Sequence, residues 1–238
     1  MDTRSHGFNS TALRILAMVL MLIDHLGATL FPDAVWMRIV GRLAFPIFAF
    51  QTAEGYRHTR NFRRYCLRLL AFGLITEIPF DLMAAGTLFY PFHQNVLFTL
   101  LLGLLAIRQL DGFRAGLPTS ELLARFGRLM LVLAAGVLLL PDYGLLGVLT
   151  VASFFLFREN KPAQFLALAA IHIFGYESGS IPLLGGAFWF PLQGFAVLAL
   201  IPIWLYNGKK GPGGKVFQYA AYGFYPLHML ILGFLQMT

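Results

Sequence analysis

The chain has 238 residues and a net charge of +7; 58% of its residues are hydrophobic and only 12% are charged. A soluble domain of this length has too little interior to bury so much apolar surface, so the composition excludes an ordinary soluble protein. The mean hydropathy of +0.70 is typical of a protein whose helices cross a lipid bilayer. The single cysteine, Cys66, excludes an intrachain disulfide.

Apolar runs between turn-forming residues predict about nine transmembrane helices. In chain order the predicted helices cover residues 12–31, 37–56, 64–85, 94–110, 124–141, 144–157, 162–176, 187–206 and 215–235. The breaks between them are loops rather than domain linkers, so we expect one all-α, polytopic membrane domain over residues 1–238. Asp24-His25 interrupts the first apolar run and no A-x-A site follows it, so we expect a retained helix rather than a cleaved signal peptide.

Basic residues gather near the amino terminus and then in every second loop of this series. These residues are Arg4, Arg14, Arg57, Arg60, Arg63, Arg64, Arg68, Arg108, Arg114, Arg125, Arg128, Arg158, Lys161, Lys209, Lys210 and Lys215. The intervening loops carry Asp33, Asp142 and Glu177. The positive-inside rule therefore predicts a cytoplasmic N-terminus and, with nine crossings, an external C-terminus. Topology also explains most of the positive charge, so we expect no nucleic-acid partner.

Several ionisable residues lie inside the predicted helices, where a charge is costly and usually has a function. At 1.5 Å per residue, His25 lies roughly 20 Å above the cytoplasmic end of the first helix, in the outer half of the membrane. Six ionisable side chains are expected at similar depth: Asp24, His25, Arg42, Glu77, Asp81 and His228. Such residues can neutralise one another around a shared cavity, as in other helix bundles.

A purely structural interpretation of this group stays open. Arg42 can pair with Asp81 or Glu77 simply to hold helices together, and a buried histidine is commonly a satisfied core residue. Because adjacent residues do not share a helix face, we expect Asp24 to meet a partner other than His25.

The loop AEGYRHTRN after the second helix, with the arginines that follow it, is the second candidate region. Topology alone can explain this cluster. Arginine also binds phosphate through two hydrogen bonds, so an anion site is the functional alternative. Arg14 lies about three helical turns below His25 on the same face of the first helix, which suggests a channel. We expect no metal site, because the remaining histidines lack ligand spacing.

A series of strings, in this order over nearly the whole chain, resembles the TraX family: LMLIDHLG, GRLAFPIFAF with AEGYRHTRN, TEIPFDL, QNVLFTLLLGLLAI, LYNGKKG and FYPLH. That family is named for the conjugal-transfer protein that N-acetylates F-type pilin. It is similar, more distantly, to membrane acyltransferases that use cytoplasmic acetyl-CoA. The resemblance implies one transmembrane acyltransferase-like domain in the bacterial inner membrane, with His25 as catalytic histidine and Arg14 in place of a basic residue at the start of the first helix.

Together, the residues and the resemblance predict an acetyl-CoA-dependent N- or O-acetyltransferase. The predicted donor site comprises Arg14, Arg57, His58, Arg60, Arg63, Arg64 and Arg68. The pantetheine arm would run up between the helices to His25, which would act as general base or carry the acetyl group. Arg42 would stabilise the oxyanion, with Glu77 and Asp81 holding Arg42 or His228 in place. The acceptor stays open among a pilin-like protein, a peptide and a glycan.

Two alternatives come from other classes of protein. A proton-coupled transporter can use buried Asp, Glu and His residues as a proton relay, although the sequence shows no convincing internal repeat. A structural subunit of a conjugation or secretion assembly would use the same residues only for packing.

Overall fold

The computed structural model of the chain describes residues 7–113, 116–176 and 179–237. Arg4, Arg114 and Glu177, three of the charged residues on which the predicted orientation depends, lie outside the described residues. Within the described ranges the chain is mostly helical, as predicted, and adds one small β-hairpin.

The helices follow the predicted order along the chain. They are α1 (Ser10–Thr29), α2 (Val35–Gly41), α3 (Ala44–His58), α4 (Phe62–Ala85), α5 (Val96–Leu110), α6 (Thr119–Leu138), α7 (Gly144–Leu156), α8 (Lys161–Ala169), the π-helix η2 (Ala170–Phe174), the 3-10 helix η4 (Leu192–Ala199), α9 (Leu200–Trp204) and α10 (Gly214–Gln236). Between η2 and η4, strands β1 (Ser180–Leu183) and β2 (Phe188–Pro191) form an antiparallel hairpin around the 3-10 helix η3 (Leu184–Gly186).

Asparagine side chains fix the start of four helices. Asn9, Asn61, Asn95 and Asn160 each accept a hydrogen bond from a backbone N–H in the first turn, at 2.9–3.0 Å. These bonds satisfy donors that the helix itself leaves unpaired. As a result α1 and α4 begin two residues before the first residue that apolar periodicity predicts.

Two predicted helices differ from the observed ones for reasons of backbone chemistry. The predicted helix 37–56 is broken at Arg42, because Pro46 has no N–H for the Arg42 carbonyl and its ring crowds that carbonyl. The predicted helix 187–206 is helical only from Leu192, and the Phe188–Pro191 segment is a strand. Aromatic residues favour a strand there.

Among the described residues, α1 alone is both long and apolar enough to cross a bilayer, by length and composition. Helices α5 and α7, the α8–η2 pair and the η4–α9 pair are apolar but shorter. The nine crossings and their orientation therefore stay predictions.

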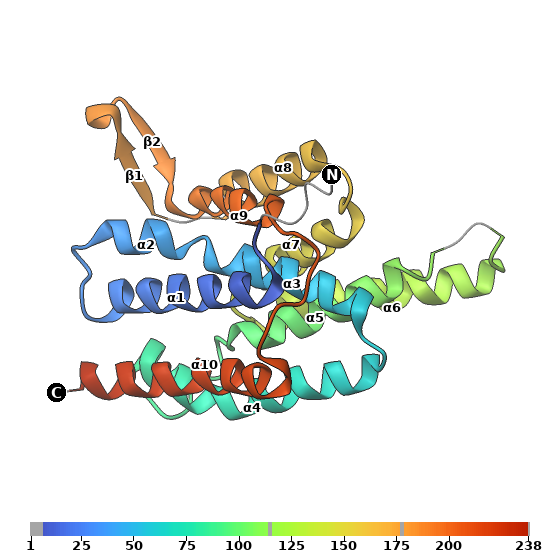
Figure 1. The fold of residues 1–238 in the computed structure, drawn as a ribbon, viewed down its shortest axis with the longest axis horizontal. Helices are drawn as coiled ribbons and strands as arrows, with labels where there is room; N and C mark the ends of the chain where they lie inside the picture. Colours follow the sequence, from blue (N-terminus) through green and yellow to red (C-terminus); the bar gives the residue numbers. More distant parts are fainter. Residues whose placement is uncertain (1–6, 114–115, 177–178, 238) are drawn as a thin grey trace.

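Figure 1 shows α1 between two sets of helices, with α4 and α10 along one side and α2, α3 and α7 on the other. The hairpin projects beyond the helices, above α2 in this view. Small residues bring α1 and α3 together, since Ala17 and Ala49 are fully buried. Gly103 does the same for α5 and α7, because a Cβ there would meet Val151 at 2.6 Å.

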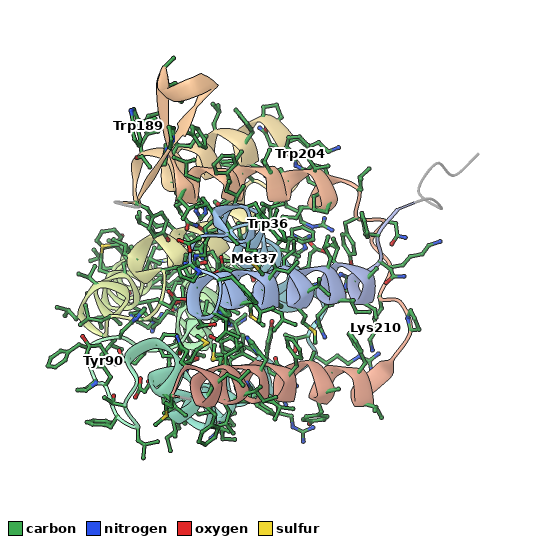
Figure 2. All side chains as sticks on the ribbon, turned by 90° about the vertical axis from the view of Figure 1, so that its left-hand side faces the viewer. Trp36, Met37, Tyr90, Trp189, Trp204 and Lys210 are labelled. Atoms are coloured by element: carbon green, nitrogen blue, oxygen red, sulfur yellow. The ribbon has the colours of Figure 1, made fainter. Side chains whose placement is uncertain are left out.

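The two ends of α1 provide the reference for the site. We call the end where α1 begins and α3 stops the basic end, because Arg14, His58, Arg68 and Lys210 lie there around one cavity. Figure 2 shows Lys210 on the connection that leads into α10, beside the start of α1. The opposite end of α1, near Thr29, is called the far end.

Candidate functional site

Two histidines from the first and last helices are in contact. Nδ1 of His25 on α1 lies 2.7 Å from Nε2 of His228 on α10, and the two rings are almost parallel, at 11°. Nδ1 of His228 lies 2.8 Å from the carbonyl oxygen of Phe224, one turn earlier in α10. The structure thus brings together two of the predicted site residues that are 203 positions apart.

The hydrogen-bond partners assign a tautomer to each ring. The Phe224 carbonyl can only accept, so Nδ1 of His228 carries the proton and, in the neutral ring, Nε2 is an acceptor. His25 must then donate from its own Nδ1 to His228. Nε2 of a neutral His25 is therefore left as a free base. This is the state that a general base requires before the reaction.

Three neighbouring cavities lie along α1, between His25 and the basic end. Their volumes are about 30 Å³ beside His25, about 90 Å³ in the middle and about 410 Å³ at the basic end. The first and second share Met21, Phe48, Val96 and Tyr225. The second and third share Arg14, Gln51, Tyr65, Gln218 and Tyr222. The three cavities therefore lie in a row along the face of α1 that Arg14 and His25 share.

The cavity at the basic end separates the predicted donor residues into two groups. Arg14, His58 and Arg68 line it. Arg57 instead lines a separate cavity of about 350 Å³ with Arg108 and Asp111. The remaining predicted residues, Arg60, Arg63 and Arg64, are exposed and line none of the cavities described for this end. The structure therefore does not bring the whole predicted cluster to one cavity, and a donor site that uses all seven residues stays a prediction.

Lys210 is a cavity residue that the sequence argument did not assign to the donor site. Its loop folds back onto the start of α1, where the Thr11 hydroxyl donates to the Pro212 carbonyl at 2.6 Å and the Thr11 N–H to the Lys210 carbonyl at 3.1 Å. The available signal was the string LYNGKKG, in which glycines allow a tight return of the chain.

Asp24 pairs with two arginines next to the histidine pair. Its Oδ2 lies 2.9 Å from Nη1 of Arg38 and contacts Nη2 of Arg42. The structural alternative that pairs Arg42 with Asp81 or Glu77 is therefore not the arrangement found, because Arg42 contacts Asp24. The reason lies at Gly41, where a Cβ would overlap the Asp24 side chain, so that only glycine lets α2 approach α1 at this level. The break after Gly41 then directs Arg42 onto Asp24.

Glu77 and Asp81 hold a loop rather than the histidines or Arg42. Glu77 accepts a hydrogen bond from the backbone N–H of Asn95 at 2.9 Å and contacts the Asn95 amide. Asp81 accepts from the backbone N–H of Tyr90 at 2.8 Å. Among the described residues these bonds fix the connection between α4 and α5. These contacts give no support to the predicted positioning role of the two carboxylates toward Arg42 or His228.

The Arg42 side chain also lies outside the cavity beside His25. Its Nη1 donates to Gln193 at 3.1 Å, its Nη2 contacts Asp24, and it does not line that cavity. The predicted oxyanion role of Arg42 has no support in this arrangement. Two tyrosines that the sequence argument did not select, Tyr143 and Tyr225, line the cavity instead.

Tyr143 adopts an unusual backbone conformation at this cavity. It has φ of 65°, which is rare for a bulky residue, and its ring stacks on Phe45 with centroids 3.8 Å apart. Asp142, which precedes it, lines the same cavity. Asp142 and Tyr143 fall in the break between the predicted helices 124–141 and 144–157, and the sequence gave no sign that they line a cavity beside His25.

His93, in the connection between α4 and α5, forms an ion pair with Asp142 that can be tested by its pH dependence. Nε2 of His93 lies 3.5 Å from Oδ1 of Asp142, and the hydrogen bond to Asp142 raises the pKa of His93 above 6.5, although burial opposes the shift. A raised folded-state pKa stabilises the fold below the unfolded pKa, and the contribution disappears as the pH rises through the folded pKa. We therefore expect His93→Gln to lower the melting temperature in detergent at about pH 5.5 and to change it little at about pH 8.5. An equal loss at both values would contradict the ion pair.

Comparison with known proteins places the chain in a family. The family model described as TraX protein matches residues 9–236. The chain is 32% identical to the probable fimbrial assembly protein FimC, serogroup H1, of Dichelobacter nodosus, over 97% of this chain and 96% of that protein. It is 28% identical to protein TraX of Escherichia coli, over 94% of this chain and 86% of that protein. No solved structure matches. The chain belongs to the TraX family.

Proposed function

We propose that this protein is a membrane-embedded acetyltransferase. Acetyl-CoA enters at the basic end, and the acetyl group passes at His25 to an amine or hydroxyl acceptor that approaches from the far end. The observation that carries the proposal is the row of three cavities that share lining residues from the basic end to His25. The name of the fimbrial relative supports a pilin-like acceptor.

The cavity at the basic end suits the phosphates of acetyl-CoA. Arg68 lies between two tyrosines, with its guanidinium carbon 5.3 Å from the Tyr65 ring centroid and 5.9 Å from that of Tyr222. Such stacking holds the planar group in place for hydrogen bonds to an anion. The cavity also contains Glu54, but that carboxylate pairs with Arg158 at 2.6 Å. The lining therefore keeps a positive balance.

The histidine pair supports proton transfer at the other end of the route. Nε2 of His25 takes the proton of the acceptor as its nitrogen or oxygen attacks the thioester carbonyl carbon. The carbon–sulfur bond then breaks, and the imidazolium of His25 returns its Nε2 proton to the CoA thiolate, which leaves as the thiol. The His228 ring accepts the Nδ1–H of His25 and so stabilises the imidazolium that forms.

Filling the middle cavity tests the proposed route. Ala221 lines this cavity, whereas its neighbour Ala220 is exposed on another face of α10. We expect Ala221→Phe to lower acetyl transfer from acetyl-CoA at least about tenfold, because the bulky ring blocks the donor from His25. Ala220→Phe is the matched control and should transfer at the wild-type rate. Equal activity of the two folded variants would overturn the proposed route.

Another prediction follows from the separation of the arginines, because some of them line the cavity at the basic end and others do not. We expect Arg68→Gln with Lys210→Gln to raise KM for acetyl-CoA at least about tenfold, because each lost charged hydrogen bond costs about 1.5–3 kcal/mol. Saturating donor should restore kcat, since only uniform binding is lost. The control, Arg57→Gln with Arg60→Gln, removes the same charge outside the cavity and should leave KM unchanged. If KM instead rises only in the Arg57→Gln, Arg60→Gln variant, the donor binds at the connection between α3 and α4.

No contact among the described residues specifically favours a proton-coupled transporter. Its proton relay needs the buried carboxylates to join the histidines, whereas Glu77 and Asp81 bind the backbone of the α4–α5 connection. Proteins of the TraX family are membrane-associated, which suits either activity.

A further inference from the structure

A chain of buried hydrogen bonds extends from the Asp24 ion pair into the protein. Nη1 of Arg42 lies 3.1 Å from Oε1 of Gln193, whose amide nitrogen lies 3.1 Å from Nδ1 of His172. Nε2 of His172 lies 3.2 Å from the hydroxyl of Thr150. The four residues come from separate segments, namely the α2–α3 break, η4, η2 and α7.

The donor and the acceptor of every hydrogen bond in this series follow from its two end groups, the Thr150 hydroxyl and the Arg42 guanidinium. The Thr150 hydroxyl donates to the Leu146 carbonyl at 2.9 Å, so toward His172 it can only accept, and Nε2 of His172 must carry the proton. Nδ1 is then an acceptor for the Gln193 amide. The Gln193 oxygen accepts from Arg42, which has only donors. A doubly protonated His172 would place two donors face to face at Gln193.

The backbone around His172 departs from regular α-helix. It is fully buried and lies in the π-helix η2, a type of helix that is found frequently at functional sites. Its ring stacks on Tyr176, with centroids 5.4 Å apart, and meets the edge of Phe45 at 6.4 Å. Sequence spacing had given no role to this histidine.

We infer that His172 is a positioning residue for the proposed acyl transfer, acting through Gln193 to hold Arg42 on Asp24. Asp24 precedes His25 on α1, and its carbonyl oxygen also accepts from Arg38 at 2.9 Å. The hydrogen bonds therefore fix the turn of α1 that presents His25 to His228. The inference rests on the proposed function for its kinetic consequence, but the hydrogen-bond directions stand apart from it.

Two substitutions distinguish positioning from packing. His172→Asn keeps an acceptor oxygen near the place of Nδ1 but removes the ring. His172→Phe keeps a ring of similar size for Tyr176 and Phe45 but removes both hydrogen bonds. If His172 positions Arg42, the Asn variant is the more active; if the ring only packs, the Phe variant is. We expect His172→Phe to lower kcat about tenfold with an unchanged KM for acetyl-CoA, and His172→Asn to stay within about threefold of wild type.

The kinetics are combined with ¹⁵N-histidine spectra of the purified full chain in detergent. In the wild type we expect His172 as the neutral ring protonated on Nε2, and we expect the His25 signals to move in His172→Phe but not in His172→Asn. A ring protonated on Nδ1, or a Phe variant that matches wild type in both kcat and His25 signals, overturns the inference. If the wild type shows no transfer while the spectra are as expected, the proposed function fails and the positioning of α1 by His172 stands.

Discussion

Replacement of His25 by alanine is expected to lower acetyl transfer by about 10²- to 10⁴-fold, the range that general-base catalysis supplies. The loss falls on kcat, because His25 lines the smallest of the three cavities along α1, far from the basic end where the donor phosphates are proposed to bind. The measurement is single-turnover transfer from labelled acetyl-CoA to a pilin-derived peptide by purified protein in detergent.

The matched control is His228→Ala, which removes the acceptor for the His25 Nδ1–H and leaves the His25 ring in place. We expect a smaller loss than for His25→Ala, because Nε2 of His25 stays available as a base. A folded His25→Ala protein with near-normal turnover would assign the histidine pair to packing. Equal losses in the two variants would indicate that both rings take part in proton transfer.

Asp24→Ala is expected to lower the free energy of unfolding by about 3–5 kcal/mol, the typical cost of removing one partner of a buried ion pair. Asp24 is 7% exposed, and the Arg42 side chain is 13% exposed. Without Asp24, the Arg42 guanidinium keeps its charge in a buried position where Gln193 offers only a neutral oxygen. Reversible unfolding in mixed detergent micelles measures the effect.

Arg38→Ala is the control for this ion pair. The Arg38 side chain is 28% exposed, and its removal leaves Asp24 paired with Arg42. We expect a loss of roughly 1 kcal/mol or less, as for a partly exposed pair. If Asp24→Ala lowers the free energy of unfolding by no more than Arg38→Ala does, the Asp24–Arg42 pair stabilises the fold no more than a surface ion pair does.

The sequence by itself determined that the protein is mostly helical, which family it belongs to, and where most of the helices lie along the chain. These properties depend on local patterns, such as apolar runs bounded by turn residues, and on strings such as LMLIDHLG that keep their order along the chain. It also selected His25 and His228, because an ionisable residue in an apolar helix stands out without knowledge of its neighbours. The strand at Phe188–Pro191 was missed because a short apolar run fits a helix or a strand equally well.

Only the tertiary structure decided which polar groups meet. Depth along a helix follows from residue number at 1.5 Å per residue, but the direction of a side chain depends on how each helix is rotated and where it bends. Arg42 meets Asp24 because Gly41 lets α2 approach α1 and Pro46 breaks the helix beside it. Lys210 and His172 reach their places through a returning loop and a π-helix, and neither leaves a periodic signal in the sequence. The sequence therefore supplied the chemical groups, and the packing of the helices chose their partners.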